Sequence, residues 1–408
     1  MSHVLAPSSA TPGAPTPGIV PPRLGAGAAV RTVVGMELRQ RLRSRGWFAL
    51  LGVFFLVVGA VTLGALGLHA STLGEMQGVS DAQRETSLRM AGQWLFDGVL
   101  MFVLTLSLLV SPALAANAIS GDRAGGTLAI TQVTLLKTWH LMAGKWLAAW
   151  VASAAFLVAA LPWLVVAALV GRVSPLFVLV GLAMILVEFA VITGIGVAVS
   201  AITGRTLFAV VVTYLLVALL TLGTLISFLL SLSVINITVQ ASQPRYGYET
   251  ATMDEATTPE EMDAQAAEDP AAWDLVADQC GGPVTDQVVP DPRRTGWMLA
   301  PNPFVVLADA TPWSPVPQSE PYMGQIGALN LISGGVRWTQ RDPLQSVECL
   351  NGELRGIDQA GEPNREGTWP VWPLGLAMQG ALTAGLLWWG HRRLDTPAGK
   401  LAAGTRVA

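Results

Sequence analysis

Residues 47–68 read WFALLGVFFLVVGAVTLGALGL, an apolar run that contains no Asp, Glu, Lys or Arg. A helix needs roughly 20 apolar residues to cross a bilayer core of about 30 Å, so this run is long enough to span it. The chain is 52% hydrophobic and only 13% charged over 408 residues, which is too apolar for a soluble protein of this size. Five further runs repeat the pattern, and Glu188 is the one charged residue within them: 98–119, 146–170, 174–203, 206–237 and 371–390. The sequence therefore predicts an all-α polytopic membrane protein with six transmembrane helices.

Basic residues lie mostly on one side of these predicted spans. Six Arg precede the first span, and four Arg or Lys follow the last. The connections between the second and third spans and between the fourth and fifth spans are also basic. The short connections on the opposite side hold three Arg in total. By the positive-inside rule, both termini of this multi-pass protein are cytoplasmic, and we expect it in the plasma membrane. Arg outnumbers Lys 21 to 3, which is typical of a GC-rich bacterial genome.

The segments before the first span differ from each other. Residues 1–28 are rich in Pro and are predicted to form a disordered cytoplasmic tail. In residues 29–46, Val30, Val34, Leu38 and Leu42 recur every four residues with Val33 beside them, while Arg39, Arg43 and Glu37 take other faces. This spacing predicts an amphipathic helix at the membrane interface. A plain basic anchor next to the first span is the alternative.

The long connection at residues 238–370 separates transmembrane helices one to five (47–237) from the sixth (371–390). It carries 20 acidic residues against 7 Arg and is placed outside by the charge count. Long loops are translocated largely regardless of charge, so its acidity is compatible with an extracellular insert. Its first part, 246–272, is acidic with few large apolar residues and is predicted to be a flexible stalk, whereas 273–369 holds more aromatic residues but no clear helix or strand period. Cys280 and Cys349, the two cysteines of the chain, both fall in this insert and are predicted to form a disulfide, with two free thiols as the alternative. Residues 391–408 complete the chain as a second cytoplasmic tail.

The connection between the second and third spans has a distinctive sequence, ISGDRAGGTLAITQVTLLKTWHLMAGK, at residues 119–145. Gly125 and Gly126 precede a short apolar piece, which predicts a brief helix held near the membrane between two spans. A displacement of such a helix would move both spans. The alternative is a solvated loop that merely carries basic residues.

This connection resembles that of the membrane subunits of type-2 ABC exporters. Asp122-Arg123, Gly126-Thr127-Leu128, Thr134, Leu136 and Gly144-Lys145 match the family pattern, whereas Leu135 stands where Pro is usual. The six spans, the preceding interfacial helix and the large insert resemble the same architecture. The resemblance implies that the segment is a coupling helix which docks on a separate ATP-binding subunit. Its contacts would come from Asp122, Arg123, Gly126, Thr127, Leu128, Val133 and Leu136, with Arg123 paired to Asp122 or to another acidic group.

Other kinds of site find little support in the sequence. Gly144-Lys145 is not a phosphate-binding P-loop, because no Gly stands five positions earlier and Trp146 replaces the required Ser or Thr. The four His are scattered and there are two Cys, so neither a metal site nor a Cys–His nucleophile pair is predicted. We therefore expect no enzyme activity, no nucleic acid and no cofactor in this chain, with ATP and Mg²⁺ bound by the partner ATPase.

Glu188 lies near the middle of the fourth predicted span, and no span offers Lys, Arg or His to pair with it. An unpaired carboxyl group in a bilayer is costly and favours the neutral acid, hydrogen-bonded to a neighbour. Glu188 either lines a translocation path or forms a static bond between helices. On the same helix Ala190, Gly194 and Ala198 form a stripe of small residues that suits close packing, within the chain or in a dimer.

Together these features predict the permease subunit of an ATP-driven ABC exporter of unknown substrate, paired with a second permease half (a homodimer or a paralogue) and surrounded by lipid. A secondary transporter is less compatible, because the spans show no inverted repeat and no ion pair. A second alternative is a non-transporting membrane scaffold or sensor whose extracellular region binds a partner.

Overall fold

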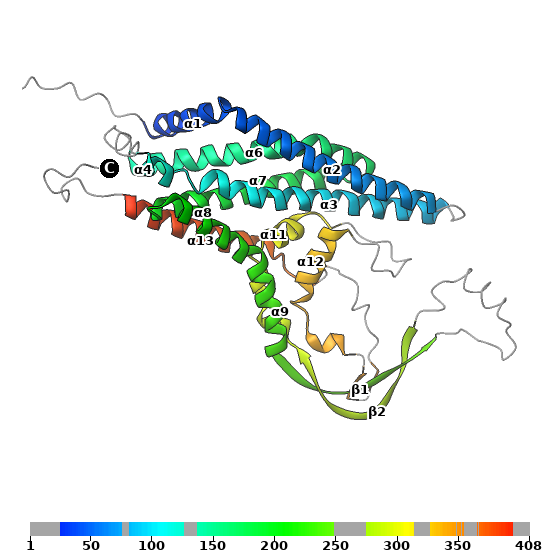
Figure 1. Cartoon of the computed structure of the whole chain (residues 1–408). Helices are drawn as coiled ribbons and strands as arrows, with labels where there is room; N and C mark the ends of the chain where they lie inside the picture. Colours follow the sequence, from blue (N-terminus) through cyan, green and yellow to red (C-terminus); the bar gives the residue numbers. More distant parts are fainter. Residues whose placement is uncertain are drawn as a thin grey trace, which may run out of the picture.

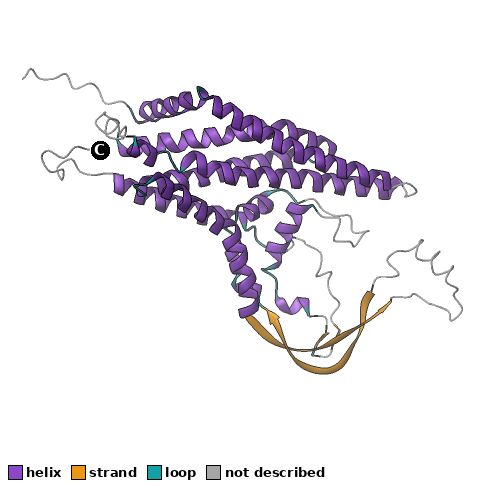
Figure 2. Ribbon diagram, viewed as in Figure 1, coloured by secondary structure: helices purple, strands orange, loops and turns teal. Residues whose placement is uncertain are grey.

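The computed structural model describes residues 25–75, 81–125, 137–248, 275–313, 327–347, 349–351, 353–354, 365 and 367–394. Most of the described chain is helical (Figure 2). The helices are α1 (Ala26–Leu42), α2 (Arg45–Glu75), α3 (Asp81–Ala115), α4 (Ser120–Ala124), α6 (Thr138–Val170), α7 (Pro175–Ile202), α8 (Thr206–Ala218), the π-helical turn η1 (Leu219–Gly223), α9 (Thr224–Val234), the 3₁₀ turns η3 (Pro292–Arg294), η4 (Gly296–Leu299) and η6 (Pro343–Ser346), α11 (Pro303–Ala310), α12 (Ala328–Trp338) and α13 (Trp372–Leu394). The strands are β1 (Asn236–Tyr248), β2 (Leu275–Pro290), β3 (Cys349–Leu350) and β4 (Glu353–Leu354).

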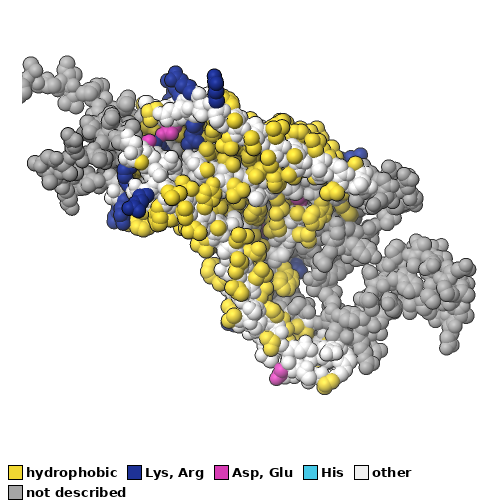
Figure 3. Space-filling model, in the orientation of Figure 1, with side chains coloured by type: hydrophobic (Ala, Val, Ile, Leu, Met, Phe, Trp, Pro, Cys, Tyr) yellow, Lys and Arg dark blue, Asp and Glu magenta, His cyan; other side chains and the backbone are white. Residues whose placement is uncertain are grey.

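Long helices pack side by side into a bundle (Figure 1). Its core lies between α2, α3, α6 and α7 and contains large, fully buried side chains such as Phe96, Phe156 and Ile185. Five helical segments in the described residues are long and apolar enough to cross a membrane: 45–71, 87–124, 138–170, 175–202 and 206–234. On the face seen in Figure 3, an apolar surface covers the bundle, and most Lys and Arg gather at the end where α1 begins and α13 ends. These features are those of a polytopic membrane protein.

The predicted sixth span, 371–390, coincides with α13, which packs lengthwise on α7. Among the described residues α13 is not one of the five most apolar long helices, so its crossing of the membrane stays a prediction. Small residues bring the two helices together. A Cβ at Gly194 would lie 2.6 Å from Thr383 Cγ2, and a Cβ at Gly390 would lie 3.1 Å from the carbonyl oxygen of Ala198. Gly194 and Ala198, two residues of the small-residue stripe, therefore pack against another helix of the same chain.

Helix α1 corresponds to the predicted interfacial helix, but Val33 is the one residue of its predicted apolar pattern that is fully buried. Ala29 and Val33 are buried, whereas Leu42 of the predicted apolar stripe is exposed. The buried face packs on α6. This difference arises because the neighbouring helix, and not only a lipid surface, is available to cover α1.

The fifth apolar run folds into two helices with a π-helical turn between them. Helix α8 follows the bundle, and beyond η1 the chain turns away as α9 (Figure 1). At this turn Asn302 Nδ2 donates to the Thr221 carbonyl at 2.8 Å and to Thr224 Oγ1 at 3.0 Å. The Asn302 Oδ1 atom also accepts from Phe304 N and caps α11. One side chain thus fastens the insert to the bend.

The described part of the insert contains an antiparallel sheet in the order β2-β1-β3-β4 (Figure 2). The absence of a strand period in the sequence was therefore misleading, and the fold has a β component beside its helices. Pro and Gly interrupt the alternation of apolar residues, and register shifts lie between Ala241 and Gln243 and between Arg245 and Tyr246. A disulfide with an S–S distance of 2.05 Å joins Cys280 to Cys349, the pair that the sequence predicts, and links β2 to β3.

Candidate functional site

A buried lysine connects three helices at the end of the bundle where α1 begins. Lys145 Nζ, on α6, lies 2.5 Å from Glu37 Oε1 of α1 and 2.7 Å from Asp122 Oδ2 of α4. The Lys145 side chain is 1% exposed. An ammonium group removed from water needs such carboxylate partners, and charge-assisted hydrogen bonds are the strongest available. We call Glu37, Asp122 and Lys145 the ionic cluster.

The residue before Lys145 explains how α1 comes close enough to form this cluster. A Cβ on Gly144 would lie 2.6 Å from Val33 Cβ and 3.3 Å from the carbonyl oxygen of Val30. Only glycine permits this distance between α6 and α1. The Gly144-Lys145 pair therefore combines a close helix contact with an ion pair to the same neighbouring helix.

The short helix α4 is held from a third side by the end of α7. Ser200 Oγ accepts hydrogen bonds from the backbone nitrogens of Ile119 at 3.0 Å and Ser120 at 2.9 Å, which satisfies amides at the helix start. Arg123 Nη1 donates to the Thr203 carbonyl at 3.0 Å. The expected pairing of Arg123 with Asp122 is corrected here, because in the described residues Asp122 pairs with Lys145 and Arg123 with a backbone carbonyl.

Only the first part of the predicted coupling motif can be placed. Asp122 and Arg123 belong to α4, and α6 begins at Thr138. Each end of the connection is thus anchored to the bundle, since Asp122 at one end and Lys145 beyond the other bind each other. The other predicted coupling residues lie outside the described residues: Gly126, Thr127, Leu128, Val133 and Leu136.

Glu188 is completely buried between α7 and α13. Neither of its carboxyl oxygens has a hydrogen-bond partner among the described residues. Its polar neighbour is Gln379 of α13, whose Nε2 donates to the Pro301 carbonyl at 3.1 Å and whose Oε1 also has no partner in the described part. A neutral Glu188 could donate to that free amide oxygen. Gln379 was missed from the sequence, although a lone amide inside an apolar run was a usable signal.

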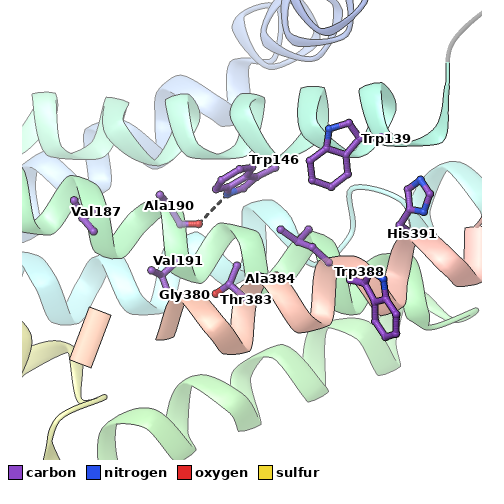
Figure 4. A pocket seen from close by; sticks show the side chains of 11 residues that line it. Trp139, Trp146, Val187, Ala190, Val191, Gly380, Thr383, Ala384, Trp388 and His391 are labelled. Atoms are coloured by element: carbon purple, nitrogen blue, oxygen red, sulfur yellow. Dashed lines mark hydrogen bonds between the residues drawn. The ribbon is translucent and has the colours of Figure 1, made fainter. Parts of the chain in front are cut away.

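An apolar groove of about 610 Å³ opens on the surface between α6, α7 and α13 (Figure 4). Trp146 forms part of its wall and donates from Nε1 to the Ala190 carbonyl at 2.8 Å. Trp139, Trp388 and His391 lie together at one end (Figure 4). The remaining lining residues are small or aliphatic: Val187, Val191, Gly380, Thr383, Ala384 and Leu387.

A buried carboxylate organises the described part of the insert. Asp309 Oδ1 accepts from Arg337 Nε at 2.6 Å and from Ser333 Oγ at 2.8 Å, while Oδ2 accepts from the backbone nitrogens of Val371 at 2.6 Å and Trp372 at 3.0 Å. Burial would raise the pKa of Asp309, but hydrogen bonds from Arg337, Ser333 and Trp372 outweigh it and hold the pKa below its usual value. Asp309 therefore joins α11, α12 and the start of α13.

A second basic residue strengthens the same region. Arg365 donates from Nη1 to the Thr311 carbonyl at 3.0 Å and from Nη2 to the Ala308 carbonyl at 3.2 Å, and it lies 5.1 Å from the Trp313 ring centre. Burial and the nearby Arg337 lower the pKa of Arg365 to about 10. It remains charged at neutral pH and completes a basic environment around Asp309.

No family model, curated protein or solved structure matches the chain. Within the described ranges no three His, Cys, Asp or Glu side chains are grouped to hold a metal ion. The described polar sites bind one helix to another, which suits the transmission of movement between helices.

Proposed function

We propose that the chain is the membrane-spanning permease subunit of a type-2 ABC exporter, which moves an unknown substrate with energy from a separate ATP-binding subunit. The ionic cluster carries this proposal. It joins the interfacial helix α1, the start of the 119–145 connection and the third membrane helix α6 through one buried Lys145. These are the parts that must move together if a partner pushes on the connection.

The contacts suggest a route for that movement. In this proposal an ATPase docks on residues 126–136 from the cytoplasm and displaces α4. The displacement reaches α6 and α1 through Asp122 and Lys145, and it reaches the α7–α8 turn through Arg123 and Thr203. Because interhelical contacts in a packed bundle favour discrete arrangements, a small shift at α4 would become a tilt of whole spans.

The remaining components lie outside this chain. ATP and Mg²⁺ would bind in the ATPase, and two permease halves, identical or paralogous, would enclose the path. Glu188 would contribute to the path or to a hydrogen bond that changes during transport. We propose a plasma-membrane location with both termini in the cytoplasm, a placement supported by the basic end of the bundle in Figure 3.

The test is co-purification of a P-loop ATPase from the native host's membranes. Leu128→Asp combined with Leu136→Asp should preserve membrane insertion and abolish capture of the ATPase, because charges would enter an apolar contact. As a matched control, Val284→Asp with Val288→Asp places two charges on exposed side chains of β2 and should leave capture unchanged. Failure of the wild-type chain to capture any ATPase, or normal capture by the Leu128/Leu136 variant, would refute the proposal.

A membrane scaffold or sensor is the second candidate, and one observation favours it. The insert has its own disulfide and its own buried Asp309–Arg337 ion pair, so it is built to present a defined surface. If the insert captures a partner from outside while the chain captures no ATPase, this function replaces the exporter.

A further inference from the structure

The apolar groove between α6, α7 and α13 has the position and the shape of a lipid site. Its floor comes from α7 and one wall from α13, and these two helices pack along each other. The lining is almost entirely apolar, so water gains little by filling it. At about 610 Å³ it falls within the range of about 300–1,000 Å³ that small-molecule sites occupy. Since the groove opens on the side of an apolar bundle, a lipid chain is the nearest molecule of suitable polarity.

One end of the groove has different chemistry. The rings of Trp139 and His391 lie 6.3 Å apart, and Arg392 lies over the Trp388 ring at 3.9 Å from its centre. Figure 4 shows Trp139, Trp388 and His391 together at this end. Tryptophan is enriched where lipid headgroups meet water, and basic pockets between transmembrane helices bind anionic headgroups.

We propose that this groove binds an anionic phospholipid from the leaflet at the α1 end of the bundle. One acyl chain would lie along the floor formed by Val187 and Val191 and against Leu387 of the α13 wall, and the phosphate would lie beside His391 and Arg392. The Arg392 guanidinium beside this end of the groove would favour an anionic lipid over a zwitterionic one. The proposal rests on the membrane location but does not depend on an ATPase partner.

Two exposed glycines of α13 provide a matched pair for the test. A Cβ at Gly380 or at Gly385 would meet no heavy atom within 4 Å, so both positions tolerate a side chain. Gly380 lines the groove, whereas Gly385 does not. Gly380→Leu should fill the groove, and Gly385→Leu makes the same chemical change on the same helix outside it.

The probe is phosphatidylglycerol with a diazirine on its acyl chain, added to the full-length protein in phosphatidylcholine nanodiscs. After illumination, peptide mass spectrometry maps the labelled residues. In the wild type we expect labels on the α7 and α13 residues that line the groove. In Gly380→Leu the labelling should fall to the level that the wild type shows with excess unlabelled phosphatidylglycerol. Gly385→Leu should keep wild-type labelling.

Arg392→Gln tests the role of charge. It should reduce labelling by phosphatidylglycerol relative to a phosphatidylcholine probe about fivefold, which corresponds to about 1 kcal/mol for one basic residue near a membrane surface.

Ala384→Leu (in the groove) and Ala381→Leu (outside it) form a second pair if either glycine variant fails to give monodisperse protein. Equal labelling of both members of a pair would overturn the site, and equal labelling by the two lipids would overturn its preference for anions. Labelling of the groove that is blocked by cross-links to a second copy of the chain would show a protein interface instead.

Discussion

Asp97 Oδ2 accepts a hydrogen bond from the backbone nitrogen of Leu329 at 3.0 Å, although 232 positions separate the two residues in the chain. Asp97 belongs to α3, and Leu329 stands in the first turn of α12, so a bundle residue caps a helix of the insert. Gln93 Nε2 holds the other carboxyl oxygen at 2.8 Å. A Cβ at Gly327 would lie 2.4 Å from Asp97 Oδ2, so glycine is required there. This contact fixes the insert on the bundle.

Asp97→Ala should release α12 from the bundle, because the buried amide of Leu329 would lose its acceptor. Loss of a helix cap costs about 1 kcal/mol, and an amide left unpaired on burial costs about 1–3 kcal/mol. We expect faster cleavage of the insert in limited proteolysis at an unchanged oligomeric state. Asp97→Asn keeps an acceptor oxygen and should be milder; equal cleavage of wild type and Asp97→Ala would contradict the capping role.

Lys145→Met should destabilise the end of the bundle that holds α1, because it removes the ammonium group that Glu37 and Asp122 share. Removing one partner of a buried ion pair costs up to about 3–5 kcal/mol. Thermal unfolding in detergent should show the loss, and the triple variant Lys145→Met/Glu37→Gln/Asp122→Asn should recover much of it. Additive losses across these variants would mean that the three side chains do not act as one cluster.

The insert should lose stability in acid through Asp309. Its pKa is lowered in the folded state, so the unfolded chain binds more protons as the pH falls through the usual carboxyl range near 3.8. The contribution of Asp309 is therefore complete at pH 7 and disappears as the pH drops below about 4 and through the folded-state pKa. Proteolysis with an acid-active protease between pH 6 and pH 2.5 should show the loss in wild type and a weaker pH dependence in Asp309→Asn. Asp286→Asn makes the same substitution on an exposed residue of β2, where the carboxylate accepts from Gln240, and serves as the control for the change of side chain itself.

Glu188→Gln should assemble like the wild type, whereas Glu188→Lys should not. An amide at this buried place can donate to the unpaired Gln379 Oε1 as a neutral carboxyl group would, whereas an ammonium group removed from water is costly. Yield and monodispersity after detergent extraction distinguish the variants. A Glu188→Lys protein with wild-type yield would show that the position has access to water.

Removal of the disulfide should weaken the insert and leave the bundle intact. Cys280 and Cys349 are 69 positions apart, and closing a loop of that length contributes about 4 kcal/mol in the chain-entropy model. Cys280→Ser with Cys349→Ser should accelerate proteolysis within 275–354 but preserve the elution volume of the protein. Mass spectrometry of alkylated, unreduced wild type should detect no added alkyl groups; two would disprove the bridge.

The sequence predicts well those parts of the fold that depend on apolar runs. Five of the six expected spans correspond to helices long and apolar enough to cross a membrane, and the turn at Gly204-Arg205 between α7 and α8 lies where the pattern ends. Burial of Glu188 also follows from its isolation in an apolar run. Such features are local, because the bilayer imposes the same requirement on every spanning segment.

The contacts between distant residues were not predictable in the same way. Asp122 and Lys145 were both noted in the motif, yet their ion pair and its link to Glu37 depend on how α1 crosses α6. Ser200, Gln379 and Asp309 are ordinary polar residues in sequence and acquire their roles from partners on other helices. The strands of the insert escaped notice because their pairing and the disulfide, and not a clean alternation, define them.

The two amides that bind Asp309 at the start of α13 have a consequence for biosynthesis. The ribosome makes residues 371 and 372 after the whole insert, so the carboxylate receives its last two donors only when α13 arrives. A product truncated before residue 371 retains Arg337 and Ser333 as donors but lacks those amides, and the surface of α7 that α13 covers stays bare. A chain that lacks α13 would thus differ from one that has it both in the insert and on the α7 side of the bundle, which gives proteolytic surveillance two marks of an unfinished product.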